Sequence, residues 1–217
     1  MKPDFDKAAT MAMKTLIENG ITETPVDSLS ILLNYPGVRV MSFTSFASQA
    51  GVDRDDLVPL FGTNQDAATF HLDIIEGISY VVVYNMRLPF DIIWRGIARE
   101  LGHIVLGHNG SRPADVRRAE ALTFAHHLIS PRPVIFQLQK SLNLTMNVLT
   151  ATTGCSDSCV EELRTLPGVN VPAEINRQVR DLFSRGIDEY IRFYKAARTE
   201  DNSPAIDFGS YMDNYIE

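Results

Sequence analysis

The sequence predicts an α+β fold: a small β-sheet with a hairpin packs on a pair of helices, and a helical C-terminal portion follows. Three observations predict this class. Residues 67–84 contain two runs of strand-forming residues around a turn. Apolar side chains recur at helical spacing in residues 91–108 and again in 113–131. The longest helical pattern, 172–198, lies near the end of the chain.

The N-terminal part is expected to be mostly helical. Residues 4–19 carry apolar side chains at helical spacing. A second helix is predicted to start with Thr24 as N-cap and Pro25 in the first turn. Val38 and Val40 then indicate a strand.

The next segment leads to the hairpin. Residues 45–50 and 53–61 are interpreted as short helices without an assigned function. The strands 67–75 and 78–84 are separated by a Glu-Gly turn, which favours a β-hairpin.

The predicted helix 91–108 carries an incomplete zinc-peptidase motif. It reads Arg99-Glu100-x-x-His103, where such enzymes have His-Glu-x-x-His. Side chains four apart lie on one helical face, so two histidines there can share a zinc ion beside the glutamate. A guanidinium has only N–H donors and cannot ligate zinc. Glu120, on the predicted helix 113–131, could supply a further carboxylate ligand.

The two motif segments together resemble the ImmA/IrrE family of metallopeptidases. That family reads His-Glu-Leu-Gly-His-x-x-Leu-Gly-His, followed by Glu-Ala-Asn-x-Phe-Ala and a Pro-terminated helix end. Residues 99–108 and 120–131 are similar to this pattern, with departures at Arg99 and Leu122. Residues 25–40 are also similar to the N-terminal part of the family.

The resemblance implies a zincin-like helix pair packed on the sheet. Zinc would be the cofactor, with His103 and Glu120 as metal ligands and Glu100 as the catalytic base. The family's hairpin strands lie against the metal helix, and such an edge could hold an extended peptide by main-chain pairing.

Arg99 has its own structural hypothesis. If no zinc is bound, its guanidinium is expected to lie near the position of the metal and to form an ion pair with Glu120 or Glu100. The other histidines are expected to pack in the core or face solvent. His108 is placed in this group because it would lie about 140° around the helix from His103 and could not share a metal ion with it. The other three are His71, His126 and His127.

The C-terminal half is predicted to be helical. We expect a metallopeptidase-like domain at 1–131, a helical portion at 132–198 and an acidic tail at 199–217. Residues 142–166 are similar to the helix-turn-helix-like tail of the family, but their acidic side chains favour packing or protein docking over DNA binding. The tail is either loosely ordered or a peptide-like segment that docks on a partner or on the protein's own groove.

The two cysteines, Cys155 and Cys159, do not make a disulfide framework. Their spacing would allow a shared metal if two further ligands were present, but no such pair is visible in the sequence. Ordinary free thiols in a reducing compartment are the expectation.

Composition limits the possible partners. The net charge of −7 and the pI near 5.2 argue against nucleic-acid binding, which depends on clustered Lys and Arg. No signal peptide or membrane-spanning apolar run is apparent. A cytoplasmic protein that does not bind membranes is expected.

These features predict an ImmA/IrrE-like metallopeptidase scaffold that acts on a protein partner. In that family the partner is typically a helix-turn-helix repressor of a mobile element or a stress response. Arg99 is expected to impair catalysis. The alternative is an inactive pseudopeptidase that binds its partner as a regulator, and a DNA-binding transcription regulator is less favoured.

Overall fold

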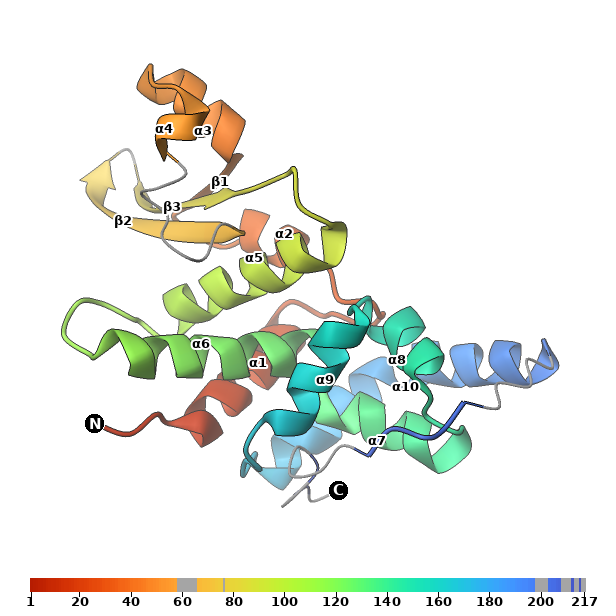
Figure 1. Cartoon of the computed structure of the whole chain (residues 1–217). Helices are drawn as coiled ribbons and strands as arrows, with labels where there is room; N and C mark the ends of the chain where they lie inside the picture. Colours follow the sequence, from red (N-terminus) through yellow and green to blue (C-terminus); the bar gives the residue numbers. More distant parts are fainter. Residues whose placement is uncertain (58–65, 76, 198–202, 208–211, 213–214, 216–217) are drawn as a thin grey trace.

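The computed structural model describes residues 1–57, 66–75, 77–197, 203–207, 212 and 215 (Figure 1). It has the predicted α+β architecture, with a small mixed sheet near the N-terminus and helices over most of the remaining chain. The strands are β1 (Val38–Ser42), β2 (Ala67–Ile75) and β3 (Ile78–Tyr84). The helices are α1 (Phe5–Glu18), α2 (Ser28–Leu33), α3 (Phe43–Ala50), α4 (Arg54–Leu57), α5 (Phe90–Val105), α6 (Ala114–Ile129), α7 (Arg132–Ser141), α8 (Met146–Thr153), α9 (Asp157–Thr165) and α10 (Ala173–Ala196).

The sheet has the strand order β1-β3-β2. β2 and β3 form the predicted antiparallel hairpin, and β1 pairs in parallel with the other side of β3. The hairpin strand β2 is therefore an edge of the sheet. Antiparallel neighbours need only a tight turn, whereas the parallel β1 and β3 are joined by a long crossover that includes α3 and α4.

The two faces of the sheet pack against different helices (Figure 1). On one face, Val81 and Val83 join Phe43 at the start of α3 in a small apolar cluster. On the other face, the fully buried Val82 belongs to the main core together with Ile97 of α5. This alternation follows from the two-residue repeat of a strand and fixes α5 beneath the sheet.

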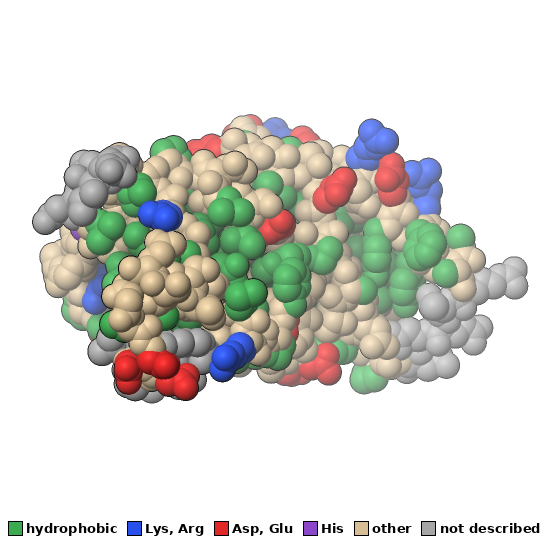
Figure 2. Space-filling model, turned by 90° about the horizontal axis from the view of Figure 1, so that it is seen from above, with side chains coloured by type: hydrophobic (Ala, Val, Ile, Leu, Met, Phe, Trp, Pro, Cys, Tyr) green, Lys and Arg blue, Asp and Glu red, His purple; other side chains and the backbone are tan. Residues whose placement is uncertain are grey.

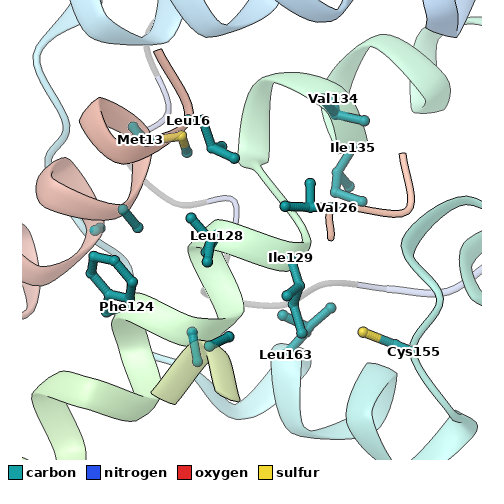
Figure 3. Close-up of a cluster of buried hydrophobic side chains, with 14 of the residues drawn as sticks. Met13, Leu16, Val26, Phe124, Leu128, Ile129, Val134, Ile135, Cys155 and Leu163 are labelled. Atoms are coloured by element: carbon teal, nitrogen blue, oxygen red, sulfur yellow. The ribbon is translucent and has the colours of Figure 1, made fainter. Parts of the chain in front are cut away.

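The main core lies between α1, α5, α6 and the C-terminal helices. Figure 3 shows Met13 and Leu16 of α1 beside Phe124 and Leu128 of α6, with Leu163 of α9 on the far side. Gly102 lets α5 approach α6 closely, because a Cβ atom at this position would lie 2.9 Å from Cδ1 of Phe124. α5 and α6 are thus held as a tightly packed pair.

Two predicted helix boundaries were wrong. The second helix begins at Ser28 rather than at Thr24, because the side chain of Asp27 caps it by accepting a hydrogen bond from the Ser30 N–H at 3.0 Å. The motif helix ends at Val105 rather than at residue 108, and Gly107 adopts a left-handed φ of 65° just after it.

The described part of the acidic tail packs on the helical portion. The Ile206 N–H donates to the Leu144 carbonyl at 2.7 Å, and Arg164 of α9 donates through Nε to the Asp207 carbonyl at 2.6 Å. The ring of Tyr215 lies 4.9 Å from that of Phe136 in α7. These contacts lie far from the loop that joins α5 and α6 (Figure 1).

Among the described residues, no helix has the length and apolar character needed to cross a membrane.

Candidate functional site

Glu100 and His103 of the motif line a cavity of about 260 Å³ between the sheet and the ends of α5 and α6, whereas Arg99 and Glu120 are not part of its lining. The walls come from both strands of the hairpin and from both motif helices. The lining includes Thr69, His71, Tyr80, Glu100, His103 and Arg117. The resemblance named Glu100 and His103, whereas Thr69 and Tyr80 had no sequence signal beyond their place in the hairpin.

Arg99 is held by two carboxylates. Its Nη1 and Nη2 atoms each lie 3.1 Å from an oxygen of Asp66, and Nη2 also lies 2.8 Å from Oε1 of Glu100. A further bond from Nη2 to the Ala67 carbonyl measures 3.2 Å. Burial alone would lower the pKa of Arg99, but the charges of Glu100 and Asp66 outweigh this effect and raise it. The guanidinium therefore stays charged and is fixed in one position.

The expected ion pair between Arg99 and Glu100 is thus present, but the alternative pair with Glu120 is not formed. Glu120 bonds instead to Arg112, whose Nη1 lies 2.7 Å from Oε2. The reason is geometric. Arg99 points toward the sheet and Asp66, while Glu120 lies behind the ring of His108.

Glu100 is buried, with 5% of its surface exposed. Its Oε1 accepts from Arg99, and its Oε2 accepts from the Thr69 hydroxyl at 2.7 Å. Burial raises the pKa of Glu100, and the nearby charge of Arg99 only partly offsets this. Both oxygens of the expected base are therefore engaged in fixed hydrogen bonds.

His103, His108 and Glu120 form a row. The Nδ1 atoms of His103 and His108 lie 2.9 Å apart, and Nε2 of His108 lies 2.9 Å from Oε2 of Glu120. His108 has only 1% of its side chain exposed, and Glu120 has none. The side chain of His108 is packed, as one of its two expected roles requires, but its expected position about 140° around the helix from His103 was wrong. The helix stops at Val105 and the turn at Gly107 folds the chain back, so the ring returns to His103.

The hydrogen bonds assign the protons in this row. His108 donates through Nε2–H to the Glu120 carboxylate, so its Nδ1 is the acceptor and His103 donates through Nδ1–H. Both rings are neutral, because burial lowers the pKa of His108 and lowers that of His103 to about 3. Nε2 of His103 then carries a lone pair.

Glu120 also holds the N-terminal end of α1 in place. Its Oε1 accepts from the Asp4 backbone N–H at 2.7 Å, and Asp4 is the N-cap of α1. Together with His108 and Arg112, this gives the buried carboxylate three donors. Such a set of donors stabilises a buried charge.

These residues do not fit a zinc ion shared by His103 and Glu120. The ring of His108 stands between them, and the two nitrogens of an imidazole point in diverging directions, so the three side chains have no common point. Arg99 adds a fixed positive charge beside Glu100. Across the described residues, no set of three or more His, Cys, Asp and Glu side chains has an arrangement that could hold a metal ion.

The remaining histidines lie outside the row. His127 is fully buried, with its Nδ1 2.9 Å from the Thr123 carbonyl. His126 is also buried, with Nε2 3.3 Å from Oε2 of Glu162. His71 is exposed on β2 and meets the ring of Tyr80 edge-on, with 5.1 Å between centroids. His71 thus contributes its imidazole ring to the lining of the cavity.

Comparisons with known proteins give no match: no family model, no curated protein and no solved structure matches the chain.

Proposed function

We propose that the chain is a pseudopeptidase of the ImmA/IrrE type, a protein-binding regulator that keeps a peptidase-like groove without the metal chemistry. The observation that carries this proposal is the bridge from Asp66 through Arg99 to Glu100. It places a cation where the motif of an active enzyme has its first zinc ligand, and it engages the residue that would be the base.

The energy of this bridge opposes metal binding. A zinc ion beside Glu100 would have to displace the guanidinium of Arg99, which is 12% exposed. Removing one member of a buried ion pair costs about 3–5 kcal/mol, because the remaining charge then stays buried without its partner. His103 would offer one lone pair at Nε2, which is too little to recover that energy without further ligands.

The groove supports a binding role. β2 is an edge strand, and its residues Thr69 and His71 line the cavity. An extended peptide could pair with this edge through its main chain, and a side chain of the peptide could then enter the cavity. The polar walls, with Glu100, His103 and Arg117, suit a polar side chain of the partner. By the resemblance, we propose a helix-turn-helix repressor as that partner.

DNA binding is not favoured. α9, the second helix of the helix-turn-helix-like pair α8–α9, carries Asp157, Glu161 and Glu162, and its Arg164 is paired with Glu161 at 2.8 Å. On the face shown in Figure 2, the Lys and Arg side chains are interspersed with acidic and hydrophobic ones rather than gathered in one basic patch. Neither feature provides the positive surface that phosphate contacts need.

The test is the zinc content of the full-length protein after incubation with equimolar zinc and desalting. We expect wild type to retain far less than one zinc ion per chain and Arg99→His to retain more. Arg185→His, which adds a histidine at an exposed position of α10 outside the cavity, should stay at the wild-type level. Near-stoichiometric zinc in wild type would overturn the proposal. No gain in Arg99→His would contradict the idea that Arg99 stands in the place of a ligand.

If a gene beside the one for this chain encodes a helix-turn-helix repressor, that repressor is the protein with which the partner proposal is tested. Size-exclusion chromatography of the mixture should show a complex in which the repressor remains intact. Shortening of the repressor by wild type but not by Glu100→Gln would instead identify a working peptidase.

A further inference from the structure

The chain has two cysteines, Cys155 and Cys159, and the structure brings them into contact. Their Sγ atoms lie 2.9 Å apart, and both thiols are free. Cys155 stands directly before Ser156, the N-cap of α9, and Cys159 lies in the first turn of that helix. Gly154, at a left-handed φ of 70°, turns the chain between α8 and α9 so that the two thiols meet.

We propose that Cys155 and Cys159 are a reversible dithiol–disulfide pair that is oxidised by hydroperoxides. A disulfide bond is about 2.05 Å long, so the sulfurs need to approach by less than about 1 Å. Disulfides in reducing compartments are usually transient and used in catalysis or redox sensing. The proposal does not depend on the function of the α5–α6 site.

Cys155 is the thiol that reacts first. Both thiols lie at the positive end of α9 and near the guanidinium of Arg95. Cys155 differs from Cys159 because its sulfur accepts the hydrogen bond from the Cys159 thiol and lies 3.8 Å from the Ser130 hydroxyl. The hydrogen bond from the Cys159 thiol lowers the pKa of Cys155 to about 7, while the same interaction raises the pKa of Cys159. A thiolate is the nucleophilic form of cysteine, so Cys155 attacks and Cys159 resolves.

The reaction balances with the hydroperoxide as oxidant. The thiolate of Cys155 attacks one peroxide oxygen, an S–O bond forms as the O–O bond breaks, and the departing oxygen takes a proton and leaves as an alcohol or water. Sγ of Cys159 then attacks Sγ of Cys155. The S–S bond forms as the S–O bond breaks, and the thiol proton of Cys159 leaves with the released oxygen as water.

The surroundings of Cys155 and Cys159 restrict which oxidants reach them and confine the effect of oxidation to the start of α9. Cys155 and Cys159 are 5% and 3% exposed, and the sulfur of Cys155 points toward Leu163 and Ile129 (Figure 3). Only a small oxidant can reach them, and the contact between the two thiols favours the disulfide over further oxidation of the sulfenic acid. One turn beyond Cys159, Glu162 pairs with Arg95 of α5 at 2.8 Å. The disulfide would thus fix the start of α9 where it meets α5.

The test uses the purified, reduced, full-length protein and hydrogen peroxide. After denaturation and alkylation with N-ethylmaleimide, intact mass should show two alkyl groups before oxidation and none after it, and dithiothreitol should restore both. We expect Cys155→Ser to lose at least about tenfold in the rate of peroxide consumption. Cys159→Ser should retain that rate and accumulate a sulfenic acid that dimedone traps.

A second measurement makes the result independent of how the serine variants fold. Wild-type protein is oxidised in buffer and, separately, when unfolded in urea. The native chain should close its disulfide several-fold faster, because the fold holds the thiols together and activates one of them. Equal or slower closure in the native chain, two alkyl groups after peroxide treatment, or disulfide-linked dimers in place of the internal bond would overturn the proposal.

Discussion

Arg99 and Asp66 form a two-pronged salt bridge in which both Nη atoms lie 3.1 Å from a carboxylate oxygen. Gly96, one turn before Arg99 on α5, makes room for this bridge. A Cβ atom at position 96 would lie 2.8 Å from Oδ2 of Asp66. The small residue and the arginine thus act together to hold a carboxylate from the start of the hairpin against the motif helix.

Removing the cation is expected to destabilise the fold. Arg99→Met should lower the free energy of unfolding by about 3–5 kcal/mol, because Asp66 and Glu100 then remain largely buried without the cation that neutralises them. Arg99→Lys should lose less, since it keeps the charge but not the planar fork. Urea unfolding measures both. Arg118→Met, at an exposed arginine of α6, is the control and should change the value by about 0.5 kcal/mol or less. A loss of similar size in Arg99→Met and the control would contradict the role of the bridge.

The close approach of Asp66 to Gly96 predicts that Gly96→Ala changes the free energy of unfolding in opposite directions with and without Asp66. In wild type, Gly96→Ala should be destabilising because the new methyl group displaces Asp66 from Arg99. In an Asp66→Ala background the same change should stabilise by about 1 kcal/mol, because alanine favours a helix over glycine by that amount. A double-mutant cycle from urea unfolding checks this. Equal effects in the two backgrounds would show that the methyl group does not act through Asp66.

Glu120 is expected to matter for stability rather than for metal binding. Glu120→Ala removes the acceptor of the Asp4 N–H, of His108 and of Arg112, and should cost about 3 kcal/mol. Hydrogen exchange should also rise in the first turn of α1, because Asp4 loses its anchor. Asp115→Ala, at an exposed acid in the same helix, is the matched control. Unchanged protection of α1 in Glu120→Ala would argue against this anchoring.

The sequence was informative where a feature is local. Glu100 and His103 share the cavity because helix geometry places them there, and Arg99 meets Glu100 as expected. Asp66 carried no local signal, since its partner is 33 residues away in the chain. His108 was misjudged because the helix was assumed to continue. The glycine at 107 is the kind of residue that ends a helix, and placing the stop there would have turned His108 back toward His103.

The buried His127 predicts a loss of stability in mild acid. Burial lowers its pKa to about 3 from 6.5, so below pH 6.5 the unfolded chain binds a proton that the folded chain does not. Its contribution is therefore fully present above pH 6.5 and is lost as the pH falls toward 3, by about 1.4 kcal/mol per pH unit. Ordinary carboxyl groups titrate mainly below about pH 5. Between about pH 6.5 and 5, His127→Leu should therefore reduce the slope of the free energy of unfolding against pH by about 1.4 kcal/mol per pH unit. Comparing the two proteins at pH 8 separates the packing change from the titration, because His127 is neutral in both states there. An unchanged slope in His127→Leu would mean that this imidazole takes up its proton in the folded protein as readily as in the unfolded chain.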